Sequence, residues 1–210
     1  MRVGTGLILI MALVAGAPVH AYDYDMEYWE FSPFIGALFA GGFEDTINDY
    51  DWAYVEQDNS FMTGVRAAYF IHSHIGFEAT WAYSRTSFYV DEDGGFFEDK
   101  ETKLTDVDLY TVSGAFVIGF LHGDFVPFMD FGAGVNLYDM DNDNLDSRAR
   151  WFFDVGGGLR AYLSETVGVR FDLRSYYTYM YWYDEGTYRY NDYEILPSLE
   201  MSAGLMLRFR

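Results

Sequence analysis

The segment Val167-Gly168-Val169-Arg170-Phe171-Asp172-Leu173-Arg174 indicates the fold most directly. Apolar side chains stand at every odd position, and all the charged side chains stand at even positions. Because successive side chains of a β-strand point to opposite faces, this period of two predicts a strand with one oily face and one charged face. The pattern returns along the chain, whereas no long amphipathic helix pattern is found.

Eight such strands are predicted, each longer than the roughly 5–6 residues most common in soluble proteins. Their connections alternate in length. They are short at 72–74, 121–124 and 164–165, and long at 42–59, 90–104, 139–148 and 180–193. Short turns at one end and long loops at the other are typical of hairpins laid side by side in a membrane barrel. The predicted strands are 30–41, 60–71, 75–89, 105–120, 125–138, 149–163, 166–179 and 194–209.

The odd-numbered positions of these strands carry no charged residue. No odd-numbered residue is charged within 31–39, 61–71, 75–83, 107–119, 125–137, 151–163, 167–177 and 195–209. We therefore expect odd-numbered side chains to share one face in all eight strands. The other face carries a predicted lumen charge network of Glu30, Arg66, Glu78, Asp108, Asp130, Asp154, Arg160, Arg170, Asp172, Arg174, Glu200 and Arg208.

A soluble calyx would turn the apolar face inward, whereas a membrane barrel turns it toward lipid. Three features favour lipid. The strands exceed the about 9–11 residues that cross a bilayer, and small residues gather on the charged face. Tyrosine and tryptophan crowd the strand ends beside the long loops, as in an interfacial girdle, for example at Tyr83, Tyr89, Tyr138, Trp151 and Tyr176.

The predicted fold is therefore all-β, an eight-stranded antiparallel up-and-down transmembrane β-barrel. It must close on itself because unpaired strand edges cannot face lipid. An even strand count places both termini on the periplasmic side of a Gram-negative outer membrane, and we expect a monomer.

Composition and the N-terminus agree with an envelope protein. A positive residue, an apolar run and a small-residue site predict a signal peptide at 1–21, which leaves 22–210 as one barrel domain. The absence of cysteine excludes disulfides and a cysteine-ligated zinc site. A formal charge of −20 argues against nucleic acid as a partner.

The passage Gly156-Gly157-Gly158-Leu159-Arg160, continuing through 161–174, is similar to the sixth-to-seventh-strand hairpin of short outer-membrane β-barrel domain proteins described from myxobacteria. The whole chain resembles the small eight-stranded outer-membrane β-barrel family, with an OmpA/OmpX-like architecture. The motif carries no known activity, and we expect no cofactor. The resemblance also implies assembly by the barrel-assembly machinery, which reads a terminal aromatic residue. Here Phe209 is followed by Arg210.

The charged lumen has two interpretations. It is an ion path, or it is a salt-bridge network that fills a barrel just wide enough for its own side chains. The network is favoured. An enzyme is disfavoured because the predicted outer loops hold no histidine, while His72, His74 and His122 fall in the short turns.

The long loops are acidic, and Asp139-x-Asp141-x-Asp143 resembles only the start of a calcium loop. We therefore expect no defined metal, catalytic or cofactor site. The acidic loops are hypothesised to contact lipopolysaccharide phosphates through divalent cations. The predicted function is structural or surface-interacting, with a narrow porin-like channel as the alternative and a lipid-modifying enzyme less favoured.

Overall fold

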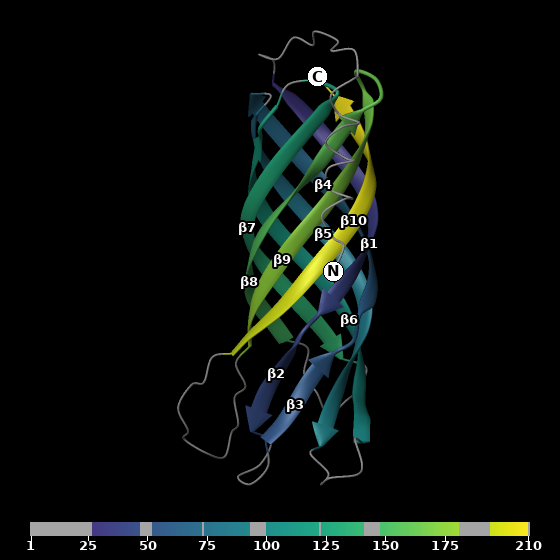
Figure 1. Cartoon of the computed structure of the whole chain (residues 1–210), viewed down its shortest axis with the longest axis vertical. Coiled ribbons are helices and arrows are strands. Elements are labelled where there is room, and N and C mark those ends of the chain that lie inside the picture. The colour runs from purple at the N-terminus through teal and green to yellow at the C-terminus, as the bar shows by residue number, and fades with distance from the viewer. Residues whose placement is uncertain are drawn as a thin grey trace, which may run out of the picture.

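The computed structural model describes residues 27–46, 52–72, 74–92, 100–121, 123–140, 148–180 and 194–209. The predicted signal peptide lies outside these residues. The chain forms a closed antiparallel barrel of steeply inclined strands (Figure 1). Its eight wall strands are β1 (Tyr28–Ala40), β4 (Ser60–His72), β5 (Ile75–Glu92), β6 (Lys100–Gly119), β7 (Phe125–Met140), β8 (Arg148–Tyr162), β9 (Val167–Met180) and β10 (Glu194–Phe209). No helix among the described residues is long and apolar enough to cross a membrane.

The predicted closure is confirmed by the pairing of β1 with β10, where Trp29 lies opposite Phe209. To close a barrel, the hydrogen-bond register must shift by a fixed number of residues around the wall, and this shift sets the tilt of the strands. One circuit of paired residues that starts at Glu30 returns to β1 ten residues further along. The circuit runs through Ala68, Glu78, Ala115, Gly132, Asp154, Tyr176, Ser198 and Ala40.

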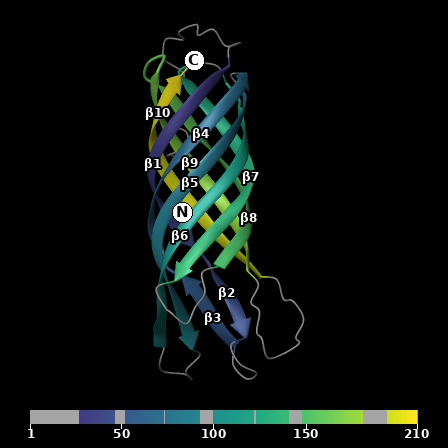
Figure 2. The same cartoon turned by 180° about the vertical axis from the view of Figure 1, so that it is seen from behind.

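The short turns gather at the end of the barrel where β1 begins and β10 finishes (Figure 2). In the turn between β8 and β9, the amides of Leu163 and Ser164 both donate to the carbonyl of Val167. In the turn between β6 and β7, Gly123 has a φ of 118°. This left-handed conformation is open to glycine and rarely to other residues, so the turn depends on that glycine.

The opposite rim is more ordered than the sequence indicated. The predicted loop 42–59 contains a hairpin of β2 (Gly42–Thr46) and β3 (Trp52–Gln57). β3 pairs with the distal end of β5 and so continues the wall beyond the start of β4. β5 and β6 also remain paired through Glu92 and Lys100. The prediction of plain loops was wrong here, because strand pairing continues past the end of the barrel.

In seven of the wall strands the predicted face is outside. Phe171 and Leu173 are 52% and 49% exposed, whereas Arg170 and Asp172 between them are buried. Side chains of phenylalanine, leucine, isoleucine and tryptophan cover the exterior in the same way. The apolar surface therefore faces away from the barrel axis, and the charged side chains of these strands fill the interior.

β6 is the exception. Its odd-numbered residues Val107, Leu109 and Val117 are buried in the lumen, whereas Val112 faces outward. The register explains the change, because odd-numbered residues of β5 pair with even-numbered residues of β6. The expectation of a common parity in all eight strands was wrong for this one. Both faces of 109–119 are uncharged, so the pattern of charges could not indicate the face.

The aromatic girdle also needs a correction. Trp151 lies on the exterior as expected, at 66% exposure, but Tyr138 and Tyr176 are buried inside the barrel. There they belong to an apolar cluster near the long-loop end. This outer cluster consists of Phe34, Leu38, Met62, Ala82, Phe88, Val107, Leu109, Tyr138, Phe152, Tyr176 and Leu196.

Candidate functional site

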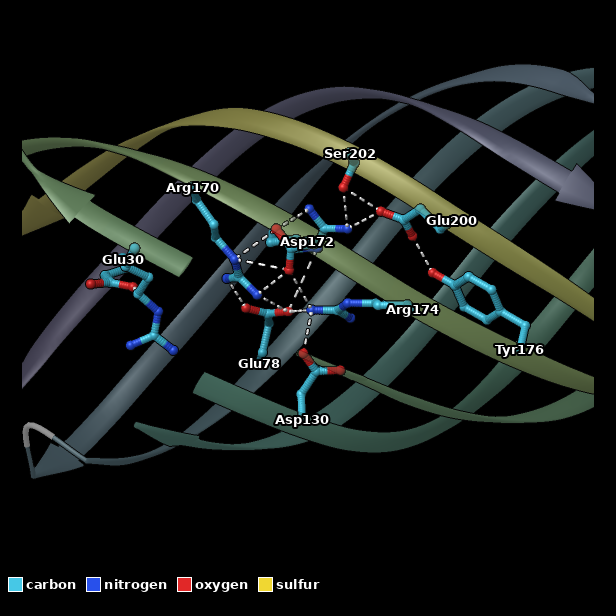
Figure 3. Close-up of polar contacts among 11 residues, drawn as sticks. Glu30, Glu78, Asp130, Arg170, Asp172, Arg174, Tyr176, Glu200 and Ser202 are labelled. Carbon is cyan, nitrogen blue, oxygen red and sulfur yellow. Dashed lines mark hydrogen bonds and ion pairs between the residues drawn. The ribbon is translucent and has the colours of Figure 1, made fainter. Parts of the chain in front are cut away.

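The charged lumen is the candidate site. We define its central cluster as Arg66, Glu78, Asp130, Arg170, Asp172, Arg174 and Glu200, all of them buried. β9 supplies three members at alternate positions, 170, 172 and 174, because a strand presents every second side chain to the same face. In Figure 3 the side chains of Arg170 and Arg174 reach Glu78, which comes from β5 across the lumen, and Asp172 contacts both arginines.

Arg170 and Arg174 both bind Glu78. Arg170 Nη1 donates to one oxygen of Glu78 and Nη2 to the other, at 3.3 Å. The second arginine places its Nη2 2.5 Å from Glu78 Oε1. Arg170 also donates from Nε to Asp172 Oδ2 at 3.0 Å and from Nη2 to Asp172 Oδ1 at 2.8 Å. The planar guanidinium therefore holds two carboxylates at once, which suits arginine rather than lysine.

Arg66 joins β4 to the far side of the lumen. Its Nη2 donates to Glu200 and to Ser202 Oγ, the latter at 3.2 Å, and its Nη1 lies 3.4 Å from Asp172. The guanidinium carbon lies 3.8 Å from the centre of the Phe34 ring. Tyr176 donates its hydroxyl to the other oxygen of Glu200. Residues more than 100 positions apart in the chain are thus bound together inside the barrel.

A second, smaller group lies toward the short-turn end. We define the short-turn cluster as Glu30, Arg160, Tyr162 and Arg208. Tyr162 donates to Glu30 at 2.6 Å, and both arginines lie 3.7 Å from that carboxylate. Arg160 is packed between the rings of Phe70 and Phe128, at 4.4 and 4.6 Å. This group has two arginines for one carboxylate.

Two predicted members have weaker contacts. Asp130 lies 3.5 Å from Arg174, too far for a good hydrogen bond (Figure 3). Asp154 is 3% exposed, and neither of its oxygens has a hydrogen-bond partner. Both carboxylates therefore face the lumen without the direct pairing that Glu78 and Asp172 have.

Asp108 does not belong to this network. It lies on the outward face of β6, where Tyr83 donates to it at 2.8 Å. Its neighbour Asp106 also faces outward, in the part of β6 beyond its pairing with β7. There Lys103, and then Ser87, lower the pKa of the Asp106 carboxyl through hydrogen bonds. The prediction of Asp108 in the lumen was wrong, because the register reverses the faces of β6.

Above the central cluster, the outer cluster leaves little space. A cavity of about 10 Å³ remains there, lined by residues that include Leu38, Met62, Tyr138 and Tyr176. That volume is about the smallest that holds one water molecule. Polar contacts continue around it, since Thr111 donates to Asn136 at 2.8 Å and Asn136 to Thr178 at 3.2 Å. The described side chains therefore fill this end of the lumen.

Among the described residues, no group of three or more histidine, aspartate or glutamate side chains is arranged to hold a metal ion. His72 ends β4 at the short-turn end of the barrel, and His74 follows it in the turn. His122, Asp141 and Asp143 lie outside the described residues.

Comparison with known proteins decides the family. The model of the outer membrane protein beta-barrel domain matches residues 8–200. The chain belongs to this family. The barrel is therefore an outer membrane protein, its apolar exterior faces lipid, and its even number of wall strands puts both termini on the periplasmic side. No curated protein matches the sequence.

Solved structures share the fold of this outer membrane barrel. Outer membrane protein OprG from Pseudomonas aeruginosa superposes with a TM-score of 0.63 at 13% identity, covering 89% of this chain and 98% of that one. AlkL, determined in lipid bilayers, has a TM-score of 0.60 at 17% identity, with 93% and 96% covered. Outer membrane protein W of E. coli has a TM-score of 0.54 at 16% identity, with 90% and 100% covered. At these identities the likeness shows the fold alone.

Three residues that the sequence did not assign to the lumen complete its contacts, and one of them, Tyr176, was expected in the interfacial girdle instead. Tyr162, Tyr176 and Ser202 all bind the network carboxylates. All three stand at even positions, on the same face as the charges. Their even positions could have placed them inside the barrel. Their polar contacts could not be predicted, because these depend on the register between strands, which the sequence does not give.

Proposed function

We propose that this outer membrane barrel has a structural or surface-interaction role, with no enzymatic activity and with a lumen closed to solutes. Its lumen network and outer cluster act as an internal brace that leaves the loops and rim as the working surface. The observation that carries the proposal is the set of arginine–carboxylate contacts spanning β4, β5, β9 and β10 below the outer cluster.

The energetics support a brace. Breaking a buried ion pair by removing one partner typically costs about 3–5 kcal/mol, because the remaining charge is left uncompensated in a poorly solvated interior. The central cluster connects three arginines to carboxylates on several strands. Each arginine therefore resists separation of the strands that it joins, and movement of one side chain would disturb the others.

The partners follow from location. Lipid of the outer membrane contacts the exterior. We further propose, from the chain's acidity, that the long loops contact lipopolysaccharide through divalent cations and that the barrel-assembly machinery inserts the protein. A monomer fits a barrel whose wall has no free edge along the strands of the circuit.

A narrow channel is the second candidate. The observation in its favour is that Asp130 and Asp154 lack hydrogen-bond partners inside the lumen, so polar groups are available to water there. The outer cluster above them opposes this function, because its rings occupy the path toward the long-loop end.

Planar-bilayer conductance separates the two functions. We expect no steady unitary openings from the purified wild-type barrel, because the outer cluster fills the lumen. The matched variant Tyr138→Ala with Phe152→Ala removes two rings from that cluster and is expected to raise the current. If the wild-type barrel showed steady unitary openings, and these stayed the same in the double variant, the lumen could not be closed by the outer cluster.

A further inference from the structure

The outer wall of β5, β6 and β7 changes character toward the long-loop rim. Trp81 and Val112, which are directly paired on the exterior, are each 48% exposed and face lipid. At the next outward position toward the rim, Tyr83 pairs with Tyr110, and the centroids of their rings lie 5.3 Å apart. An apolar row followed by an aromatic row is typical of the boundary between acyl chains and headgroups.

The next outward row is charged. Arg85 of β5 pairs with Asp108 of β6, and Asp108 pairs with Asp139 of β7, so three neighbouring strands place one guanidinium and two carboxylates side by side. Neighbouring strands lie about 4.8 Å apart, so the row spans about 10 Å. Arg85 and Asp139 are exposed and Asp108 is half-buried. This charged row therefore lies at the height of the lipid headgroups.

A cavity of about 260 Å³ opens at the charged row, where β7 ends and β6 continues toward the rim. Its lining consists of Arg85, Asp106, Val107, Asp108, Asp139 and Met140. Pockets for drug-sized ligands measure roughly 300–1,000 Å³, so this cavity suits a small polar headgroup better than a whole lipid. A charged cavity directly above a lipid-facing wall fits the head of an amphiphile whose chains lie along that wall.

The charges of the lining favour a ligand that carries both signs. Lys103 Nζ lies 2.6 Å from Asp106, so that carboxylate already has a cation. Tyr83 donates to Asp108 Oδ1 at 2.8 Å, and because a carboxylate accepts at several positions, this bond orients Asp108 without filling it. The charged row has one guanidinium for two carboxylates. A phosphate alone would be repelled by the carboxylates, whereas a group with a phosphate and an ammonium meets opposite charges at both ends.

We propose that this cavity binds the phosphoethanolamine headgroup of an outer-membrane lipid. The ammonium donates charge-assisted hydrogen bonds to Asp108 and Asp139, and the phosphate accepts them from Arg85. The acyl chains lie along the apolar exterior of β5, β6 and β7. Phosphatidylethanolamine and lipid A that carries phosphoethanolamine share this headgroup. The contact needs no divalent cation, so it is separate from the bridging proposed for the acidic loops.

Lipid retention by the refolded barrel tests the site. Protein in a mild detergent with a chelator is incubated with phosphatidylethanolamine, phosphatidylcholine or phosphatidylglycerol of identical chains, and native mass spectrometry measures the bound lipid. The choline headgroup keeps the phosphate and the positive charge but has no N–H donor, and the glycerol headgroup has no cation. We expect phosphatidylethanolamine to be retained about tenfold more strongly than either, because only its ammonium makes the charge-assisted hydrogen bonds.

Matched variants locate the headgroup. Asp108→Asn with Asp139→Asn should abolish the preference over phosphatidylcholine, because an amide offers no negative charge to the ammonium. Arg85→Gln should lower the retention of phosphatidylethanolamine, because the phosphate loses its cation. Glu165→Gln, in a short turn at the opposite end of the barrel, is the control and should change neither result. Heat-modifiable gel mobility checks folding, and Asp139→Asn alone decides if the double variant does not fold.

Lipid A with and without phosphoethanolamine distinguishes the two sources of the headgroup. Stronger retention of the substituted lipid A than of phosphatidylethanolamine identifies the glycolipid as the ligand, and the reverse identifies the phospholipid. Two results would overturn the proposal. The first is equal retention of the three phospholipids by the wild-type barrel, because the headgroup is then not recognised. The second is a preference for phosphatidylethanolamine that persists in the aspartate variants, because the ammonium is then bound elsewhere.

Discussion

At the scale of single residues, arginine decides how the lumen is held. Arg170 is buried, yet it contacts Glu78 and Asp172 with three of its nitrogen atoms and packs against Phe128. A lysine offers a point charge in place of this planar fork and would reach only part of the arrangement. The stability of the central cluster thus depends on the shape of the guanidinium group as well as on its charge.

Replacing Arg170 should therefore destabilise the barrel strongly. We expect Arg170→Ala to lower the free energy of unfolding by about 3–5 kcal/mol, because Glu78 and Asp172 lose a buried partner. Urea unfolding in lipid vesicles, followed by heat-modifiable mobility, measures the change. Arg85→Ala, on the exposed face of β5, is the matched control and should change stability by less than about 0.5 kcal/mol.

Glycine at position 158 reflects a close approach of two strands. A Cβ there would lie 1.9 Å from the carbonyl oxygen of Phe171 and 2.8 Å from the ring of Phe128. Both are far inside normal contact distances. The residue therefore lets β8 and β9 meet beside a lumen ring, which a larger side chain would prevent.

Gly158→Ala should lower stability by about 1–3 kcal/mol, the range for overpacking a tight interior. Gly114→Ala is the control, because a Cβ at Gly114 meets only the carbonyl oxygen of Glu78, at 4.0 Å. The same unfolding assay compares them. Equal losses in the two variants would show that crowding at Gly158 is not the cause.

At the scale of elements, β6 shows where a sequence pattern loses its information. In β9, charges at Arg170, Asp172 and Arg174 identify the lumen face without ambiguity. In β6, residues 109–119 have no charge on either face, and the only evidence was Asp106 and Asp108 at the rim. At the rim, a carboxylate on the outer face meets water and lipid headgroups rather than acyl chains. A charged residue there is tolerated on either face, so it does not indicate which face of the strand points into the lumen.

Cysteine labelling tests the orientation of β6, and the native chain has no cysteine to interfere. Val112→Cys should react with a lipid-soluble maleimide, because its side chain points toward the bilayer. Thr111→Cys should be protected inside the lumen, where Thr111 is bound to Asn136. The opposite labelling pattern would restore the common parity that the sequence suggested.

At the scale of the whole molecule, closure brings the first and last strands together. β1 and β10 are neighbours in the wall, so the lumen network can join Glu30 to Arg208 and Arg66 to Glu200 across large sequence separations. The rim is uneven, because β2, β3, β5 and β6 project further than the remaining strands (Figure 2). One side of the outer surface is therefore a raised sheet.

Orientation in the membrane is tested with two exposed positions. Asp58→Cys, beside the end of β3, should react with an impermeant maleimide in intact cells. Glu165→Cys, in the short turn between β8 and β9, should react only after the outer membrane is permeabilised. Reversed accessibility would place the long loops in the periplasm.

The fold class, the alternation of faces in seven strands and most of the lumen charges could be predicted from the amino-acid pattern alone. This was possible because a period of two and a burial preference are local properties of each strand. Three features became visible only in the folded barrel. The odd residues of β6 point inward, the rim carries an extra hairpin, and Asp154 lacks a hydrogen-bond partner while Glu78 binds two arginines. These features depend on register and closure, which are set by strand pairings distant in the chain and leave no periodic trace within a single strand.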